Sequence, residues 1–315
     1  MENILLVGNG FDIAHELPTS YLTYAEYVDT FERLFHNPII MESSGLNITA
    51  KPKYNYLDTF MFALEDQRDE FAKLLDDNIW NIFFREKYGR LKIGDYWYDL
   101  ENLIKLEVND RSSKILEDYD RAIYDFNRFR RAFEIYIYYF TELAMGNIYK
   151  YVKKLDVYRH MKDITPQYII NYNYSNTFSR FYDSMIEVDY LHGHAEARWG
   201  TDTCNIVFGI NEISIDERKE TCKEFTKKWQ MNEAGIKPKY KEWLCNGKYN
   251  LHVYGHSLDE TDKESLREIL LSEAINQIYI WVLDEKDGLR KLNNISSIIG
   301  EKAEVVKEKI IFNKI

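Results

Sequence analysis

Residues 3–12 read NILLVGNGFD, and this stretch decides the class of fold. The four apolar residues at positions 4–7 favour a short buried strand, which the glycines at positions 8 and 10 would end with a tight turn. Helical patterning resumes after Asp12. A buried strand, a glycine turn and a helix in this order are typical of the start of a parallel α/β sheet.

The same alternation of strand and helix returns in the second half of the chain. Short apolar or alternating runs, each expected to form a strand, occupy residues 168–170, 186–192, 205–208, 251–254 and 277–283. Helical stretches between these runs supply the crossover connections that parallel strands require. The sequence therefore predicts an α/β fold with a Rossmann-like, mostly parallel sheet and flanking helices, built from residues 1–50 and 156–315.

Residues 51–155 separate the first strand from the others and carry almost wholly helical patterns. Within 112–152, apolar residues recur every three or four positions and so share one face of a long helix: Ala122, Phe126, Phe129, Phe133, Ile137, Phe140 and Ala144. We expect a large all-helical insertion, whose simplest role is scaffolding. We also predict that it forms a homo-oligomer interface or a lid over the site.

Composition narrows the function. Lys and Arg total 41 against 52 Asp and Glu, so the chain of 315 residues carries a formal charge of −11, which disfavours generic binding to nucleic-acid phosphates. Three cysteines without a CxxC pair fit neither a zinc ribbon nor a closed set of disulfides. The start of the chain lacks a signal-peptide pattern, and no apolar run reaches membrane-spanning length. We therefore expect a cytoplasmic protein that does not bind membranes.

The glycine turn after the first predicted strand is half of a dinucleotide fingerprint. Glycines allow a phosphate to approach backbone N–H groups at the start of a helix. The segment from Gly8 through Asn9, Gly10 and Phe11 to Asp12 is accordingly a candidate nucleotide-binding loop. The third glycine of the fingerprint is missing, so a simple turn is an equal alternative, and Asp12 either contacts a ligand or caps the helix.

Two further polar clusters follow predicted strands. Residues 171–177 read NYNYSNT and hold more Asn, Ser and Thr than one helix cap needs, which makes Asn173 a candidate for holding a ribose or a water. His192 ends the run at 186–192, and the glycine after it leaves room for a ligand beside the imidazole. Histidine near its ordinary pKa suits a general base at neutral pH, although a lone histidine is more often structural.

A fourth cluster, YGHSLDETD at residues 254–262, again follows a predicted strand. The backbone of Gly255 and the hydroxyl of Ser257 suit a phosphate at a helix start. Asp259 and Asp262 would repel that phosphate, so we assign them to capping or ordering the turn. Because ligands gather beyond the carboxyl ends of the strands in open α/β sheets, the four clusters together indicate one site.

Taken in order, five segments resemble the AbiH family of bacterial phage abortive-infection proteins along nearly the whole chain: ILLVGNGFDIAHELPTSY, NYNYSNTF, LHGH, VFGI and VYGHSLDETD. The segment from Trp97 through Asp99 to Glu101 is similar to a family feature as well. The resemblance implies growth arrest of infected cells, with a phage or host protein as the trigger.

More remotely, the order of the motifs resembles the sirtuin-like NAD-consuming superfamily. That resemblance implies a first loop at Gly8 and Gly10, a functional asparagine at Asn173, a catalytic histidine at His192, and a phosphate or ribose loop at Gly255 and Ser257. Asp12 and Ser175 depart from the pattern, since the superfamily has a small hydroxyl residue at the first position and an aspartate at the second. Its zinc-ribbon cysteines are absent, which argues against a protein deacylase.

These patterns lead to one hypothesis and two alternatives. The sheet domain binds NAD or a close nucleotide, as substrate or ligand, and hydrolyses its N-glycosidic bond without a metal, with Asn173 and His192 as catalytic residues. One alternative is a metal-dependent nuclease or phosphoesterase that uses His192, His194 and His256 with Asp12 or Asp259. The other is a non-catalytic, nucleotide-gated sensor whose aromatic helices contact a phage or host partner.

Overall fold

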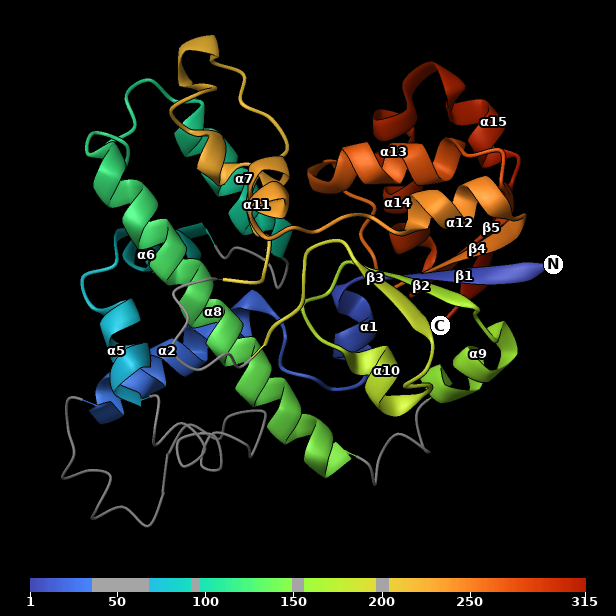
Figure 1. Ribbon diagram of the computed structural model, residues 1–315, viewed down its shortest axis with the longest axis horizontal. Helices are drawn as coiled ribbons and strands as arrows, with labels where there is room; N and C mark the ends of the chain where they lie inside the picture. Colours follow the sequence, from blue (N-terminus) through green and yellow to red (C-terminus); the bar gives the residue numbers. More distant parts are fainter. Residues whose placement is uncertain (36–67, 92–96, 149–155, 197–203) are drawn as a thin grey trace. The chain divides into compact units, whose positions relative to one another are not determined.

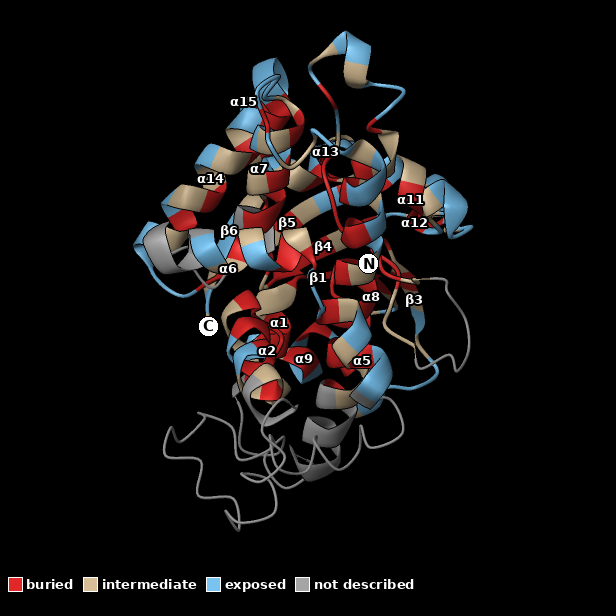
Figure 2. Cartoon of the chain, turned by 90° about the vertical axis from the view of Figure 1, so that its left-hand side faces the viewer, coloured by how far each residue is buried: buried red, intermediate tan, exposed pale blue. Residues whose placement is uncertain are grey.

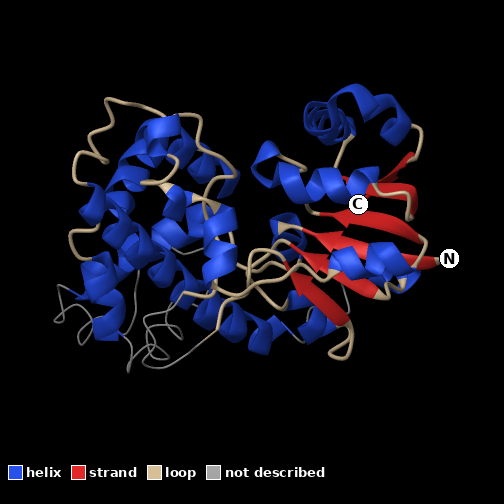
Figure 3. Ribbon diagram, turned by 45° about the horizontal axis from the view of Figure 1, so that its top comes forward, coloured by secondary structure: helices blue, strands red, loops and turns tan. Residues whose placement is uncertain are grey.

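The computed structural model describes residues 1–35, 68–91, 97–148, 156–196 and 204–315. These residues fall into two compact units, each made of segments far apart in the sequence. Unit 1 comprises Met1–Glu16, Tyr149–His194 and Val207–Ile315, and unit 2 comprises Leu17–Ile148 and Ala195–Ile206. Unit 1 holds all the strands that the described residues form, whereas unit 2 is helical (Figure 3).

The core of unit 1 is a six-stranded sheet in the order β3-β2-β1-β4-β5-β6 (Figure 1). Its strands are β1 (Glu2–Val7), β2 (Tyr168–Asn171), β3 (Glu187–Tyr190), β4 (Tyr249–Tyr254), β5 (Ile275–Val282) and β6 (Ile310–Lys314). Every pairing between these strands is parallel, which confirms the predicted α/β fold. The direction in which strands are added reverses between β1 and β4, and doubly wound sheets bind their ligands at this point.

Helices cover both faces of the sheet. One face packs through Ile4 and Leu6 against α12 (Tyr240–Asn246), α13 (Lys263–Leu271), α14 (Glu285–Ile299) and α15 (Ala303–Lys307). The other packs through Leu5 and Val7 against α1 (Asn9–Ala14), α9 (Asp156–Ile164) and α10 (Thr177–Phe181). Because both faces are buried, residues 4–7 are apolar without alternation.

The predicted strand at residues 205–208 is wrong. This segment lies largely inside the protein, but its backbone hydrogen bonds go to single residues instead of a neighbouring strand. The N–H of Val207 donates to the carbonyl oxygen of His192 at 2.8 Å. Phe208 exchanges two hydrogen bonds of 2.9 Å with the side-chain amide of Gln230 in α11 (Lys227–Glu233). The segment is therefore an extended loop held from both sides.

Sequence patterns did not predict β6. This strand lies at the edge of the sheet, pairs with β5 alone and leaves Ile311 and Phe312 each 41% exposed. A short edge strand that is only partly buried has a weak sequence signal. Unit 1 also contains short 3-10 turns: η2 (Asp216–Arg218), η3 (Lys223–Phe225), η4 (Glu260–Asp262) and η5 (Gly300–Lys302).

Unit 2 contains α8 (Tyr119–Ile148), a helix of 30 residues. The other described helices of the unit are α2 (Tyr21–Phe35), α5 (Arg68–Leu75), α6 (Ile79–Leu91) and α7 (Trp97–Val108), of which α5 and α6 pack on α8. The predicted apolar face of α8 is confirmed, since Ala122, Phe126, Phe129, Phe133 and Ile137 are buried (buried residues are red in Figure 2). The side chains of Phe140 and Ala144 lie outside the described part of the chain.

The helical unit begins at Leu17, whereas the sequence placed residues up to 50 with the sheet. Aromatic packing explains the difference: Tyr24, Tyr27 and Phe31 of α2 place their ring centroids 4.8–5.3 Å from rings of α5 and α8. The Trp97–Glu101 segment opens α7, where Glu101 is buried. None of the described helices is long and apolar enough to cross a membrane.

Candidate functional site

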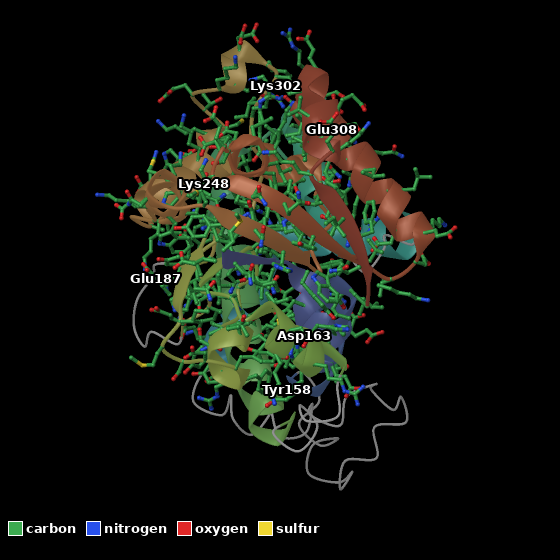
Figure 4. The ribbon with its side chains drawn as sticks, turned by 90° about the vertical axis from the view of Figure 1, so that its right-hand side faces the viewer. Tyr158, Asp163, Glu187, Lys248, Lys302 and Glu308 are labelled. Carbon is green, nitrogen blue, oxygen red and sulfur yellow. The ribbon has the colours of Figure 1, made fainter. Side chains whose placement is uncertain are left out.

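The carboxyl ends of the strands gather the polar segments that sequence analysis singled out. In parallel strands these ends share one edge of the sheet, so segments far apart in the chain meet there. Glu187 and Lys248 mark the opposite edge, where β3 and β4 begin (Figure 4). Within unit 1, the polar side chains of the carboxyl edge form two separate clusters, one around Asp12 and one around Asp262.

The glycines of the first and fourth segments pack the two turns directly against each other. The N–H of Gly10 donates to the carbonyl oxygen of Gly255 at 2.8 Å, and the N–H of Gly8 donates to that of Tyr254 at 3.2 Å. Gly255 has φ +68°, and a Cβ atom on it would lie 2.1 Å from the amide nitrogen of Phe11. The glycines therefore have a packing role, and the N–H groups of Gly8 and Gly10 are engaged within the protein.

The Asp12 cluster consists of Asp12, Asn173, Ser175 and Thr177. The Asp12 carboxylate accepts hydrogen bonds from the side-chain amide of Asn173 (3.2 Å) and from the hydroxyls of Ser175 (2.6 Å) and Thr177 (2.7 Å). Its oxygens thus bind the segment after β2, and the start of α1 has no side-chain cap. Asp12 is 1% exposed, and burial raises its pKa to about 6 although the three hydrogen bonds oppose the rise.

Asn173 is held in one orientation inside this cluster. Its backbone N–H donates to the side-chain oxygen of Asn171 at 2.7 Å, and the Asn171 side chain donates in turn to the carbonyl oxygen of Ser175 at 2.9 Å. With its NH2 group directed at Asp12, the Oδ1 atom of Asn173 is buried without a hydrogen-bond partner in the described part of the protein. Such an acceptor costs about 1–3 kcal/mol, so a donor from a ligand or a water would fit there.

The Asp262 cluster consists of Asp262, His192, His256 and Lys227, all of them at least nine-tenths buried. Oδ1 of Asp262 lies 2.9 Å from Nε2 of His192 and 2.8 Å from Nζ of Lys227. Oδ2 of Asp262 lies 3.4 Å from Nε2 of His256. Lys227 also donates to the carbonyl oxygen of Thr261 at 3.0 Å. The buried aspartate and lysine charges therefore neutralise each other, as burial requires.

Both histidines turn Nε2 to Asp262, and they differ in whether Nδ1 already accepts a hydrogen bond. Nδ1 of His256 accepts a hydrogen bond of 2.9 Å from the N–H of Leu258, so the proton of the neutral ring sits on Nε2 and faces Asp262. Leu258 itself has φ +55°, a conformation that residues with side chains rarely adopt. His192 also turns Nε2 to Asp262, but among the described residues its Nδ1 meets no such donor. His192 is thus the histidine of this pair whose Nδ1 can accept a proton.

Electrostatics keeps His192 neutral and Asp262 charged. Burial and then the Lys227 ammonium lower the pKa of His192, and the contact with Asp262 offsets this only in part. Burial alone would raise the pKa of Asp262, but Lys227 and His192 overcome that effect and hold the pKa well below its ordinary value. A neutral imidazole hydrogen-bonded to a carboxylate is an arrangement suited to general-base catalysis.

The structure brings Asn173 and His192 to the same edge of the sheet but directs them to different clusters. Tyr172 and Tyr174 flank the His192 ring, with centroid distances of 5.3 and 6.1 Å. Asn173, which stands between these tyrosines in the chain, points to Asp12. No hydrogen bond joins Asn173 to His192 among the described residues. The segment 172–174 therefore contributes to both clusters.

Sequence analysis missed the charged residues around His192. Asp262 occupies the N-cap position of α13, but its side chain makes no capping hydrogen bond and instead binds the two histidines and Lys227. Asp259 orders the turn, as predicted, by accepting the N–H of Thr261 at 3.2 Å. The segment after β4 contains two aspartates, Asp259 and Asp262, although one turn needs only one capping acid. This surplus was the sequence signal that one of them has another role. Lys227 stands outside every motif, and only the fold brings it to the site.

The remaining candidates lie beside these clusters. Asn9 begins α1, and Phe11 is fully buried in the core next to it. Ser257 is half-buried, and its carbonyl oxygen accepts from the Asn294 side chain at 3.0 Å. His194 places its ring 4.7 Å from that of Tyr190. In the described part of the chain, no three His, Cys, Asp or Glu side chains form a group that could hold a metal ion.

Comparison with known proteins identifies the family of the chain. The family model described as bacteriophage abortive infection AbiH matches residues 4–284, a range that contains both clusters. Neither the curated proteins nor the solved structures gave a match. The chain therefore belongs to the AbiH family of bacteriophage abortive infection proteins.

Proposed function

We propose that unit 1 binds NAD or a closely related nucleotide at the carboxyl edge of its sheet and hydrolyses the N-glycosidic bond. Family membership points to a role in abortive infection of bacteriophage, and loss of NAD would arrest the growth of an infected cell. The observation that carries the proposal is the contact of 2.9 Å between His192 and Asp262, beside the point where the strand order reverses.

The reaction needs a water, a departing base and a general base. The bond between C1′ of the ribose and the nicotinamide nitrogen breaks, the nitrogen keeps the electron pair, and the water oxygen forms a new bond to C1′. Nδ1 of His192 takes the proton that the water gives up, and the imidazolium then passes it to solvent. The products are ADP-ribose, nicotinamide and one proton.

Asp262 supports His192 in two ways. It holds Nε2 of the ring and thereby leaves Nδ1 as the accepting nitrogen. It also stabilises the imidazolium that forms, because its carboxylate lies next to the new charge. Lys227 keeps Asp262 ionised for this purpose. A positioned general base contributes typically about 10²–10⁴-fold in rate.

Asn173 gives the nucleotide a second point of attachment. Its buried Oδ1 atom lacks a donor in the described part of the chain, and a ribose hydroxyl or the attacking water would supply one. The sirtuin-like pattern sets an asparagine and a histidine around NAD, and this chain departs from that pattern at Asp12 and Ser175. The Asp12 carboxylate accepts a hydrogen bond from the Ser175 hydroxyl at 2.6 Å. A carboxylate and a hydroxyl are therefore both present, as in the sirtuin-like pattern, but each stands at the position where that pattern has the other.

Release of nicotinamide from NAD tests the proposal. Purified protein is incubated with NAD and free nicotinamide is followed by chromatography. We expect turnover that falls by about 10²-fold or more in His192→Gln and in Asp262→Asn. His252→Gln is the matched control, since His252 is another buried histidine of unit 1 and lies within β4, where it pairs with Leu5 and Tyr279. Equal turnover by His192→Gln and the wild-type protein would remove His192 from the mechanism.

The same assay separates an enzyme from a nucleotide-gated sensor. Tight binding of NAD by calorimetry without release of nicotinamide, even with phage lysate added, would favour a sensor. Absence of both binding and turnover would contradict a nucleotide site. Light scattering at micromolar concentration tests the homo-oligomer interface that we propose for the helical unit 2, and a strict monomer would contradict it.

A further inference from the structure

We infer that Asp12 is a positioning residue, which turns the side-chain amide of Asn173 so that its Oδ1 atom accepts a hydrogen bond from a hydroxyl of the ligand. The identity of that ligand, a nucleotide, rests on the proposed function, whereas the orientation of the amide does not. Asp12 itself does not touch the ligand and acts through Asn173.

The charge of Asp12 decides which end of the Asn173 amide faces it. An ionised carboxylate only accepts hydrogen bonds, so the NH2 end turns toward it at 3.2 Å and the C=O end turns away. The opposite orientation would set two acceptors against each other in a buried place, where repulsion is poorly screened. Asn171 prevents the backbone from relieving that repulsion, because it holds the N–H of Asn173 at 2.7 Å.

Ser175 and Thr177 occupy the rest of the Asp12 carboxylate. The Ser175 hydroxyl donates to one oxygen at 2.6 Å, the Thr177 hydroxyl donates to the other at 2.7 Å, and the two hydroxyls lie 2.8 Å apart. With three donors bound and 1% of its surface exposed, Asp12 presents no open face to a ligand. The acceptor of this cluster that stays without a partner in the described protein is Oδ1 of Asn173.

An acceptor that is buried without a donor favours ligands that bring one. The cost of such an atom corresponds to a preference of about 5- to 150-fold for a ligand with a hydroxyl at that place over one without it. A purely structural role of Asp12 would change stability but not this ratio. The ratio of the two dissociation constants is therefore the quantity to measure.

Calorimetry on the whole protein with NAD, and with analogues that lack one ribose hydroxyl at a time, provides the test. We expect one analogue to bind the wild-type protein about 5- to 150-fold more weakly than NAD. In Asp12→Asn the new amide can donate to Oδ1 of Asn173, so the ratio should fall to about one. Asn250→Ala is the matched control: its Oδ1 is also buried and unpartnered in the described chain, but it lies at the amino edge, at the start of β4. This variant should keep the wild-type ratio.

Three results would contradict the inference, and a fourth would contradict only the proposed function. Equal binding of NAD and every analogue, or binding of none, would show that no ligand hydroxyl reaches Asn173. If the ratio of the two dissociation constants is the same in Asp12→Asn as in the wild-type protein, Asp12 does not contribute to the preference for the ligand hydroxyl. If Asp12→Asn does not fold, nuclear Overhauser contacts between the Nδ2 protons of Asn173 and the β protons of Asp12 in the wild-type protein decide the orientation, and their absence contradicts it. Selective binding without release of nicotinamide would contradict hydrolysis but leave this inference standing.

Discussion

The amide nitrogen of Gly10 lies 2.8 Å from the carbonyl oxygen of Gly255, so the turn after β1 and the turn after β4 touch backbone to backbone. Each turn leads into one of the two polar clusters, because Asp12 follows Gly10 by two residues and His256 comes directly after Gly255. This contact therefore fixes the acid of one cluster relative to an imidazole of the other.

We predict that Gly255→Ala lowers the free energy of unfolding by about 3 kcal/mol or more. The added Cβ would lie 2.1 Å from the amide nitrogen of Phe11, and φ +68° is itself unfavourable for alanine. Urea denaturation measures the loss. Gly235→Ala is the control, with φ +67° but no atom within 4 Å of the added Cβ, so it should cost only about 1–2 kcal/mol. Equal losses in the two variants would contradict the packing role of Gly255.

Lys227→Met should raise the pKa of His192. After burial, the lysine charge is the largest effect that lowers this pKa, and its loss leaves the Asp262 carboxylate beside the imidazole without the Lys227 cation. Titration of the His192 ring by NMR checks the direction, and an unchanged or lower pKa would contradict it.

The same variant should be less stable by about 3–5 kcal/mol, since it leaves a buried carboxylate without its cation. Lys227→Met combined with Asp262→Asn removes both charges and should recover part of the loss. Urea denaturation of the double variant and of both single variants, Lys227→Met and Asp262→Asn, gives the comparison. A double variant that loses as much as the two single variants together would show that the two charges do not interact.

Asp12→Asn should change how stability depends on pH. Asp12 has a pKa of about 6 in the folded protein against an ordinary value of 3.8. Because the folded protein has the higher pKa, the contribution of Asp12 to stability is fully present below pH 3.8 and is lost as the pH rises through about 6. The loss amounts to roughly 3 kcal/mol. The variant does not titrate, so it should gain about this much relative to the wild-type protein between about pH 4 and pH 7. Parallel pH curves from urea denaturation would contradict the raised pKa.

His15→Gln should show a pH dependence of the opposite sign. His15 is fully buried, its Nδ1 donates to the carbonyl oxygen of Phe11 and its Nε2 accepts from the Tyr182 hydroxyl, both at 2.6 Å. Burial lowers its pKa from 6.5 to about 4, so its contribution is present above 6.5 and is lost as the pH falls through 4. The stability advantage of the wild-type protein over the variant should shrink by roughly 3 kcal/mol across this range. An advantage that stays constant on acidification would argue against a buried neutral His15.

Much of the sheet could be predicted because it rests on local patterns. The apolar run at residues 4–7 and the glycine after it indicated a first parallel strand, and the structure has β1 there. The runs at 205–208 and 310–314 show the limit of such patterns. Both contain short apolar stretches, yet only the second lies beside a free strand edge, that of β5, and becomes a strand. Pairing depends on what lies next to a segment in space, and a local pattern carries no information about it.

The sequence by itself determined that strands, glycine turns and polar segments alternate, and this was enough to place Asn173 and His192 at the carboxyl edge of a parallel sheet. Only the tertiary structure decided their partners, because Asn173 and Asp12 are 161 residues apart and Lys227 and Asp262 are 35 apart. No periodicity links residues at such separations. Burial then requires each charge to find a donor or a counter-charge among the side chains that the fold brings near it.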